Sequence, residues 1–400
     1  MNAAPDVTDT VPSFPFPRSD PLQPPPALKR LLACAPVSKV RLENGQRVWL
    51  VLRHADVRAL MTDPRISADS TRTGFPPIGP SGANPNLRTF PRRDAPEHTT
   101  QRRMVAAEFT AERVEVLRPQ IRRIASELLD AMLRRAPPVD FVQCVALPLP
   151  TLVISGILGV PYADHDIFQG FEAAVMALDP AESARGAREE LEYLDGLVKR
   201  KATQGGDDLI SRLIAEQVRP GHLSHDELVR MVRTLLSAGH ESTANMTALG
   251  VLSLLLDPAS REQLRCNPGL TGNAVLELLR LHSIFHLFSP RVAVADIAIG
   301  GETIRAGEGV ILSLIGANHD PEAFPEPHKL DVTRDARQQM ALGFGAHHCL
   351  GQGLARMELA EIVPMVFERA PDLKLAVPFE SLRFRSDRST YGVYELPVTW

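Results

Sequence analysis

Apolar residues recur at helical spacing over most of the chain after residue 27, whereas strand-like alternation is confined to short stretches. Two short alternating stretches, 37–42 and 47–52, flank Asn44-Gly45, a pair typical of a hairpin turn, so a small sheet is expected there. A second β pattern covers residues 292–299, 303–304 and 309–314. The main helical patterns cover residues 97–109, 114–133, 147–158, 164–178, 187–201, 228–256, 270–281 and 354–367.

Two long segments lack both patterns. Residues 1–26 contain eight prolines, which exclude a helix and favour an extended tail that lies on the surface or is disordered. The folded domain is therefore expected from residue 27 on. Residues 66–95 are rich in Gly, Pro, Ser and Asn, with Phe75, Leu87 and Phe90 among them. A long loop of this composition is expected to pack over a pocket.

Composition excludes few functions. The net charge of −4 gives no reason to expect a nucleic-acid partner or an anionic membrane surface. The four cysteines lie far apart without paired spacing, which favours a reducing cytoplasm over a disulfide framework. The N-terminus has neither the pattern of a secretory signal nor that of a membrane anchor, so a cytoplasmic protein is expected.

The longest helix is predicted over residues 228–256. Ser224 is placed to cap it, and Glu227, three residues on, completes a capping box. At about 1.5 Å per residue this helix would be about 45 Å long, enough to cross a whole domain. Midway, residues 238–243 interrupt the apolar pattern with a polar segment. By itself this segment is typical of a helix kink with solvated polar groups.

A single cysteine stands between a glycine-rich loop and the apolar run at 354–367. There, Cys349 would lie near free backbone N–H groups and a helix dipole, which lower the pKa of a thiol and favour a metal-binding thiolate. Gly343, Gly345 and Gly351 would let the backbone approach a large, flat group such as a haem. On these residues alone a buried, inert cysteine is the alternative. A zinc site with the two adjacent histidines is disfavoured, because neighbours on a tight loop converge poorly on one ion.

The run at 343–356 reads G-x-G-x-H-x-C-x-G-x-x-L-A-R, and at every one of those positions it resembles the cysteine-ligand loop of the cytochrome P450 family. One departure is Leu342, where the family usually has Phe. The resemblance covers nearly the whole chain after residue 27. It implies the cytochrome P450 fold, a single domain over residues 27–400 that is mainly α with a minor β region. It also implies haem b between the 228–256 helix and the helix after Cys349, with the thiolate of Cys349 on the iron.

The polar segment at 238–243 matches the family's oxygen-binding pattern, (A/G)-G-x-(D/E)-T. The resemblance implies that Ala238 and Gly239 leave room for dioxygen, and that Glu241 and the following hydroxyl relay protons to it. Threonine is usual where Ser242 stands, and Thr243 follows one step later. Because serine lacks the methyl group that restricts a threonine rotamer, we expect somewhat leakier coupling of electrons to product.

Further positions are assigned by the resemblance alone. Glu277 and Arg280 match the family's E-x-x-R, a buried ion pair with a structural role. Residues 162–206 correspond to the lid over the substrate channel, although an ordinary surface helix pair fits the same pattern. Besides Cys349, the residues expected to contact the haem are His98, Arg102, Ala238, Gly239, Arg291, Gly343, Phe344, His347 and Gly351, of which the four with cationic side chains would bind its propionates. The residues expected to line the substrate pocket are Phe75, Leu87, Phe90, Leu235, Phe285, Leu287, Phe288 and Tyr391.

The function implied by the resemblance is insertion of one oxygen atom from O2, by hydroxylation or epoxidation, into an apolar small molecule. The pattern of the chain is similar to members that tailor secondary metabolites or oxidise foreign compounds. No flavin- or nicotinamide-binding segment is evident in the sequence, so a separate ferredoxin and ferredoxin reductase are the expected electron donors. Two alternatives are a haem-thiolate enzyme with another reaction (isomerisation, dehydration or reduction) and a haem gas sensor without turnover.

Overall fold

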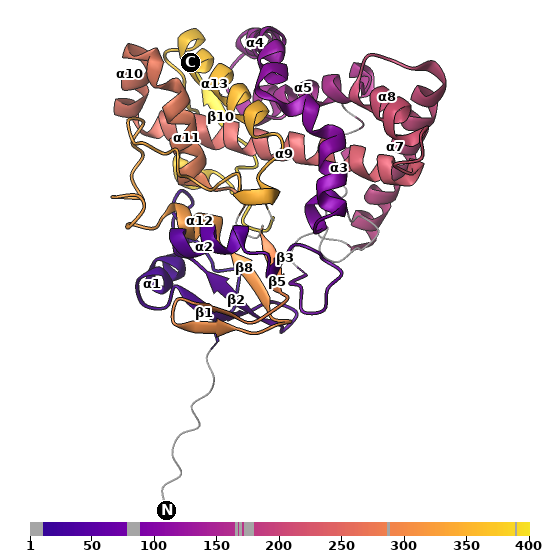
Figure 1. Ribbon diagram of the computed structural model, residues 1–400. Helices are drawn as coiled ribbons and strands as arrows, with labels where there is room; N and C mark the ends of the chain where they lie inside the picture. Colours follow the sequence, from indigo (N-terminus) through magenta and orange to yellow (C-terminus); the bar gives the residue numbers. More distant parts are fainter. Residues whose placement is uncertain are drawn as a thin grey trace, which may run out of the picture.

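The fold is described here from a computed structural model, for residues 11–77, 89–164, 167, 170–171, 180–285, 289–388 and 390–400. Figure 1 shows a large helical part and a smaller part that carries a sheet together with helices α1 and α2. Helices account for most of the ordered elements, so the expected fold class, mainly α with a minor β region, is confirmed. No helix in these residues combines the length and the apolarity that crossing a membrane requires.

Helix α9 (His225–Leu256) is the longest element and runs through the helical part (Figure 1). The predicted capping box is formed: Ser224 Oγ accepts a hydrogen bond from the Glu227 N–H, and Glu227 Oε2 accepts one from the Ser224 N–H. All residues from 243 to 254 are buried, whereas Ala238 is exposed and Ser242 is half-buried. Because Leu235 and Leu236 before it are buried too, the polar segment lies between two buried stretches of α9.

Helices α5, α7 and α13 pack directly against α9, and α4 packs against α5 and α13. The predicted helix at 97–109 is α3 followed by a 3-10 turn at Ala107–Phe109, and the helix predicted over 187–201 lies inside the longer α7. The described helices besides α9 are α1 (Pro26–Cys34), α2 (His54–Thr62), α3 (Glu97–Ala106), α4 (Ala111–Leu133), α5 (Pro148–Leu158), α7 (Pro180–Gln204), α8 (Leu209–Leu213), α10 (Pro258–Cys266), α11 (Thr271–His282), α12 (Leu314–Asn318) and α13 (Gln352–Arg369).

The strands are short and form small sheets. They are β1 (Val37–Arg41), β2 (Arg47–Val51), β3 (Ile66–Ser67), β4 (Val139–Asp140), β5 (Pro290–Ala293), β6 (Ile297–Ile299), β7 (Glu302–Ile304), β8 (Gly309–Leu312), β9 (Lys374–Leu375) and β10 (Pro397–Thr399). The largest sheet has the order β1-β2-β8-β5-β3, and the other two are β4-β10-β9 and β6-β7. The predicted hairpin at 37–52 is formed, and β2 runs parallel to β8.

This sheet positions one candidate haem contact. The β pattern predicted over 292–299 is divided between β5 and β6, and β5 starts earlier, at Pro290. Arg291 is therefore a strand residue, opposite Val310 of β8. Because Val310 is fully buried and also pairs with Trp49 of β2, the backbone of Arg291 is anchored in the middle of the sheet.

The N-terminal segment is described from residue 11. It has no helix before α1, contains bends and a turn at 20–23, and packs closely on the rest of the molecule. Phe14 is buried, and its N–H donates to the Arg41 carbonyl oxygen at 2.8 Å. Further along, the Pro21 carbonyl oxygen accepts a hydrogen bond from the Tyr391 hydroxyl at 2.8 Å, and the Arg18 guanidinium lies 4.0 Å from the centre of that ring. Residues 11–25 thus join β1 to the C-terminal segment.

Candidate active site

The loop before α13 places Cys349 close to the start of that helix. The Cys349 N–H donates to the Leu342 carbonyl oxygen at 2.8 Å, which closes the loop. Gly343 and Gly345 have φ of +76° and +72°, a left-handed conformation that glycine adopts without strain. A Cβ on Gly345 would lie 2.8 Å from the Met61 carbonyl oxygen, so the loop packs tightly on α2. The backbone of the loop itself therefore requires these two glycines.

Gly351 and Phe344 flank Cys349 in different ways. Gly351 is the N-cap of α13 with an ordinary φ of −84°, and a Cβ there would have open space within 4 Å. Unlike Gly343 and Gly345, Gly351 is therefore required neither by its backbone conformation nor by the packing around it. Phe344 lies beneath the Arg58 guanidinium, 4.3 Å from the ring centre, so α2 fixes one face of its ring.

Burial decides the acidity of the free thiol. It raises the pKa of Cys349, although the Gly351 N–H and the nearby Arg102 act in the opposite direction. The expectation that the helix N-terminus lowers this pKa is therefore wrong for the chain by itself, because loss of hydration outweighs the hydrogen bond from Gly351 and the charge of Arg102. Binding to a metal ion deprotonates a thiol outright, so ligation and not the helix would generate the thiolate.

Four predicted haem contacts converge beside this loop. His98 and Arg102 lie on α3, Arg291 on β5 and His347 in the loop. The rings of His98 and His347 are 4.1 Å apart between centres, and Arg102 Nη2 donates to the His348 carbonyl oxygen at 2.7 Å. Three elements far apart in the sequence thus bring their cationic side chains together.

Arg102 and Arg291 give this cluster of four side chains a positive charge, and Asp94 is an acidic group whose charge acts on Arg291 and on His98. Burial and the neighbouring Arg92 lower the pKa of Arg291 to about 10, and burial and Arg291 lower that of His347 to about 3. His98 Nε2 and His347 Nδ1 are buried and have no hydrogen-bond partner in the described part of the chain. Buried donors and unbalanced positive charge are costly unless an anion binds. The cluster fits a group that carries carboxylates, as the two propionates of haem do.

Arg92 belongs to the same cluster and was not predicted. Arg92 is half-buried, burial lowers its pKa to about 10, and its charge acts on both Arg291 and His347. The sequence carried a weak signal, since Arg92 follows the apolar Phe90 closely in a loop that was expected to pack over a pocket.

The small residues in the middle of α9 lie on different faces of the helix. Ser242 Oγ donates to the Ala238 carbonyl oxygen at 2.8 Å, so these two residues share the less buried side of the helix. A Cβ on Gly239 would lie 2.8 Å from Ile154 Cγ1 of α5, and Thr243 is only 4% exposed. Gly239 therefore allows two helices to pack closely, and the expectation that it leaves room for dioxygen is replaced by this role. Ala238 keeps its predicted role as an expectation.

Glu241 is held by a residue from the far end of the chain. Its Oε1 lies 3.1 Å from Arg385 Nη1, and the side chains are only 13% and 16% exposed. Burial raises the pKa of Glu241, while Arg385 and Arg388 oppose that change. No local pattern in the sequence indicated Arg385 as a partner, because it lies 144 residues after Glu241.

The predicted substrate-pocket residues are only partly accounted for. Leu87, Leu287 and Phe288 lie outside the described residues. Phe90 packs near His98, with ring centres 6.3 Å apart, and Phe75 lies 5.7 Å from the Arg92 guanidinium.

The remaining pocket candidates come from α9 and from the segments after α11. Leu235 is buried in the core, and Phe285 pairs with Thr390 in an isolated bridge. The Tyr391 ring stacks on Phe384, and its hydroxyl bonds the N-terminal segment. Their roles in substrate binding stay predictions.

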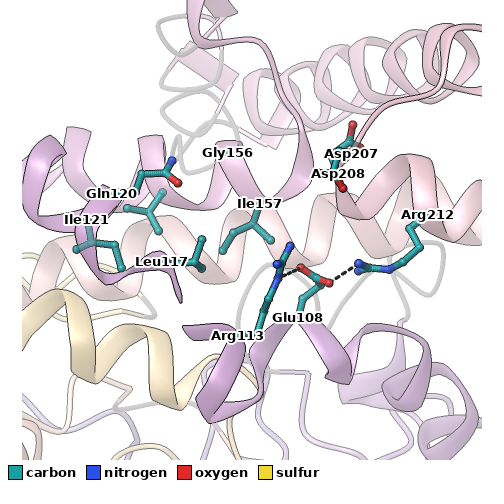
Figure 2. Close-up of a pocket in the computed structure, with 11 residues that line it drawn as sticks. Glu108, Arg113, Leu117, Gln120, Ile121, Gly156, Ile157, Asp207, Asp208 and Arg212 are labelled. Atoms are coloured by element: carbon teal, nitrogen blue, oxygen red, sulfur yellow. Dashed lines mark hydrogen bonds and ion pairs between the residues drawn. The ribbon is translucent and has the colours of Figure 1, made fainter. Parts of the chain in front are cut away.

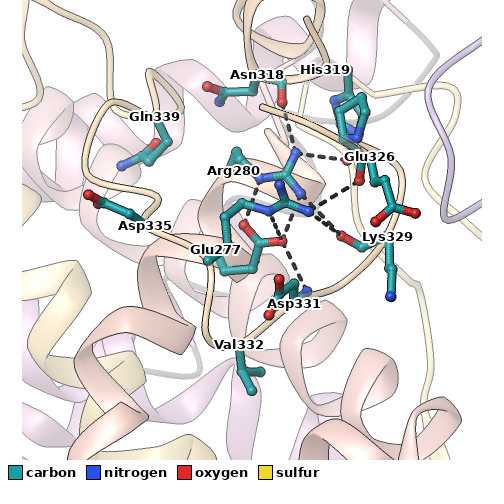
Figure 3. A network of polar contacts seen from close by, with 12 residues as sticks. Glu277, Arg280, Asn318, His319, Glu326, Lys329, Asp331, Val332, Asp335 and Gln339 are labelled. Carbon is teal, nitrogen blue, oxygen red and sulfur yellow. Dashed lines mark hydrogen bonds and ion pairs between the residues drawn. The ribbon is translucent and has the colours of Figure 1, made fainter. Parts of the chain in front are cut away.

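Glu277 and Arg280 pair as expected and hold a long segment together (Figure 3). Arg280 Nε lies 2.6 Å from Glu277 Oε2, and both side chains are fully buried. Arg280 Nη1 also donates to the carbonyl oxygens of Asn318 and Pro327, each at 2.8 Å. Arg334 Nε lies 3.1 Å from Glu277 Oε1. The pair therefore fixes the segment between α12 and the Cys349 loop.

A separate polar cavity lies between α4, α5 and α8 (Figure 2). Glu108 pairs there with Arg113 on one side and with Arg212 on the other, and Asp207 and Asp208 line the same space. None of the residues predicted for the active site lines it, so this cavity plays no part in the site described above.

Comparison with known proteins identifies the family. The family model described as cytochrome P450 matches residues 269–369. Along its whole length the chain is 46% identical to cytochrome P450-SU2 of Streptomyces griseolus, over 98% of that protein. The chain belongs to the cytochrome P450 family. Other P450s that it resembles include pentalenic acid synthase of Streptomyces avermitilis, 43% identical over 97% of each chain.

Solved structures of P450s have the same fold as this chain. The crystal structure of the mycinamicin VIII C21 methyl hydroxylase MycCI from Micromonospora griseorubida superposes with a TM-score of 0.91 at 38% identity, over 98% of this chain and all of that one. Family members bind haem through a cysteine thiolate, so this P450 has haem b as its cofactor, with Cys349 as the axial ligand. When bound, the haem supplies the activation of dioxygen, because thiolate ligation pushes electron density to the iron and favours O–O cleavage. The chain is a cytochrome P450 monooxygenase.

Proposed function

We propose that this monooxygenase hydroxylates or epoxidises an apolar small molecule, in secondary metabolism or in the oxidation of foreign compounds. The observation that carries the proposal is that aromatic rings lie beside the cationic cluster: Phe90 is 6.3 Å from His98 between ring centres, and Phe75 is 5.7 Å from the Arg92 guanidinium. Relatives named as a C21 methyl hydroxylase and as pentalenic acid synthase support this class of substrate.

In this proposal each side chain has a limited task. Arg92, His98, Arg102, Arg291 and His347 bind and orient the haem propionates, which the unpartnered ring nitrogens of the two histidines support. Ala238 keeps the less buried face of α9 free of bulk. Ser242 and Glu241 move protons to that face, because a hydroxyl and a carboxyl in adjacent positions can pass protons inward from solvent.

The direct test is a titration of the purified haem-loaded protein with a panel of polyketides, terpenoids, macrolides and peptides, followed by haem absorption. A low-to-high-spin shift is expected for compounds of the substrate class, and turnover under ¹⁸O2 should then place one labelled atom in the product. A product without label would favour isomerisation, dehydration or reduction. The spectrum of the reduced, CO-bound protein checks in the same samples that Cys349 ligates the iron.

A separate ferredoxin, itself reduced by a ferredoxin reductase, is the proposed electron donor. Exposed arginines near the Cys349 loop, Arg58, Arg103 and Arg356, would attract an acidic partner to the side from which the sulfur is approached. Electron transfer should therefore slow as salt concentration rises, because salt screens such long-range attraction. Transfer rates that do not change with salt would contradict this docking surface.

A further inference from the structure

The C-terminal segment supplies the counter-charge of Glu241 by a fixed backbone arrangement. The Arg385 N–H donates to the Gly392 carbonyl oxygen at 2.9 Å, next to the isolated bridge between Phe384 and Val393. We call residues 383–394 the C-terminal hairpin. It meets α9 just after Glu241, because a Cβ on Gly392 would lie 2.0 Å from Asn245 Oδ1. Arg385 is therefore held in place by its backbone.

The ion pair between Glu241 and Arg385 is shielded from solvent. Glu241 Oε1 and Arg385 Nη1 are 3.1 Å apart, with about one sixth or less of either side chain exposed. Arg385 also lies 5.2 Å from the centre of the Tyr394 ring, and its buried Nε has no hydrogen-bond partner within the residues that the structure describes. In such a poorly hydrated place the attraction between opposite charges is screened far less than at the surface.

The other charged groups around Glu241 make Arg385 its main partner. Arg388, from the same hairpin, also acts on Glu241, and its own partners are Asp387 and the Tyr394 hydroxyl. His240, the preceding residue on α9, is fully buried, and burial together with Arg385 lowers its pKa to about 4. This histidine is therefore neutral near pH 7 and does not compete with Arg385 for the Glu241 carboxylate.

We propose that Arg385 is a positioning residue of the proton relay: it holds the Glu241 carboxylate at the C-terminal hairpin and sets the pH range in which Glu241 delivers protons to Ser242. The inference rests on the role of Glu241 in the proposed function. It adds a residue near the C-terminus to a relay whose other residues, Glu241 and Ser242, both lie on α9.

The expected direction follows from two opposing effects. Burial favours the protonated, neutral carboxyl of Glu241, and the guanidinium of Arg385 favours the carboxylate. Without Arg385 the carboxyl would keep its proton up to a higher pH. A relay group must alternate between both forms, so the pH range of efficient turnover should move upward when Arg385 is neutralised.

The experiment compares Arg385→Met, Arg385→Lys, Glu241→Gln and the double variant R385M/E241Q with the full haem-loaded protein. The matched control is Arg383→Met, because Arg383 lies on the same hairpin but is 73% exposed and pairs with Glu395. Coupling is measured as product and peroxide formed per reductant consumed, between about pH 6 and pH 9, with a compound that shifts the haem spin state. A second, independent measurement is the thermal unfolding midpoint over the same pH range.

R385M should form product about tenfold more slowly near pH 7 and recover at higher pH, while R385K keeps the wild-type profile and R383M is unchanged. In the E241Q background, the further change of Arg385 to Met should not alter the pH profile. Burial raises the pKa of Glu241, so the folded chain keeps a proton that the unfolded chain has already released. Stability therefore falls as the pH rises from the pKa of the unfolded chain to that of the folded chain. R385M should extend that fall to higher pH, and E241Q should remove the extension.

Three outcomes would overturn the inference in distinguishable ways. If E241Q changes coupling but R385M has the wild-type pH profile, Arg385 has no part in the relay, and the proposed role of Glu241 stands. If the change of Arg385 to Met shifts the pH profile of coupling equally in the wild-type and E241Q backgrounds, Arg385 acts only as a structural residue. If E241Q itself leaves coupling unchanged at every pH, the proposed role of Glu241 fails, and the inference fails with it.

Discussion

The Ser242 hydroxyl can donate to another group only after it rotates away from its hydrogen bond within α9. In the structure the hydroxyl donates to the Ala238 carbonyl oxygen one turn earlier, at 2.8 Å. A serine at this position can rotate away from the helix more freely than a threonine, because it lacks the γ-methyl group that restricts χ1. In the proposed relay, the orientation of this one hydroxyl would decide how reliably protons reach the less buried face of α9.

Ser242→Ala should raise the fraction of reductant lost as peroxide about fivefold, because the variant has no hydroxyl to pass the proton on. Ser242→Thr should lower that fraction below the wild-type value, since the methyl group holds the hydroxyl in fewer orientations. Both are measured as peroxide formed per reductant consumed with a bound substrate. An unchanged peroxide yield in S242A would remove Ser242 from the relay.

Gly239→Ala tests the packing role of this glycine. The new Cβ would lie 2.8 Å from Ile154 Cγ1, so α5 and α9 must shift apart, at a cost of about 1–3 kcal/mol in the free energy of unfolding. Gly272→Ala on α11 is the matched control, because its Cβ meets nothing within 4 Å and should stabilise the helix by about 0.5–1 kcal/mol. Urea unfolding measures both variants. Equal effects of the two substitutions would contradict close packing at Gly239.

At the scale of elements, the segment between α12 and the Cys349 loop has little secondary structure of its own and depends on a buried charge pair. Glu277 accepts from both Arg280 and Arg334, and Arg280 in turn donates to the Asn318 and Pro327 carbonyl oxygens. One helix, α11, thereby organises a segment that would otherwise be a long loop. The pair acts on the cysteine loop through this segment.

Glu277→Gln should destabilise the protein by about 3–5 kcal/mol, because it leaves two arginines near a buried site without their carboxylate. Glu262→Gln is the control: Glu262 and Arg265 on α10 have the same spacing, but their side chains are 56% and 65% exposed. Water and salt screen such an exposed pair, so its loss should change the stability little. The two variants are compared by urea unfolding, and similar losses would show that burial does not distinguish these pairs.

At the scale of the whole molecule, buried histidines make folding depend on pH. Burial lowers the pKa of His282 to about 3, and repulsion from Arg18 and Arg280 acts in the same direction. His282 is in hydrogen-bond contact with Ser253, at 2.9 Å. Below its ordinary pKa of 6.5 the unfolded chain binds a proton that the folded chain does not, so stability falls as the pH decreases.

His282→Gln should make the unfolding midpoint less dependent on pH between about pH 7 and pH 5, because glutamine does not titrate there and can still bond Ser253. Glu358 acts in the opposite direction, since burial raises its pKa well above the usual range and the folded chain takes up its proton first. The test is therefore the difference in slope between wild type and H282Q, measured by thermal unfolding. Identical slopes would contradict a neutral, buried His282.

Features that depend on neighbours along the chain could be predicted from the sequence. The capping box of α9, the glycines of the Cys349 loop and the hairpin at 37–52 each follow from local backbone geometry, which a few consecutive residues determine. The E-x-x-R spacing likewise puts Glu277 and Arg280 on one face of a helix. For the same reason the family could be identified from one loop.

Only the tertiary structure decided what is buried and which distant residues meet. Glu262 and Arg265 have the same spacing as Glu277 and Arg280, yet one pair is exposed and the other is enclosed. The acidity of Cys349, the side of α9 that Gly239 occupies and the partner of Glu241 likewise depend on elements far away in the sequence. Hydration and through-space charge interactions are set by the whole packed molecule, so no local pattern of residues encodes them.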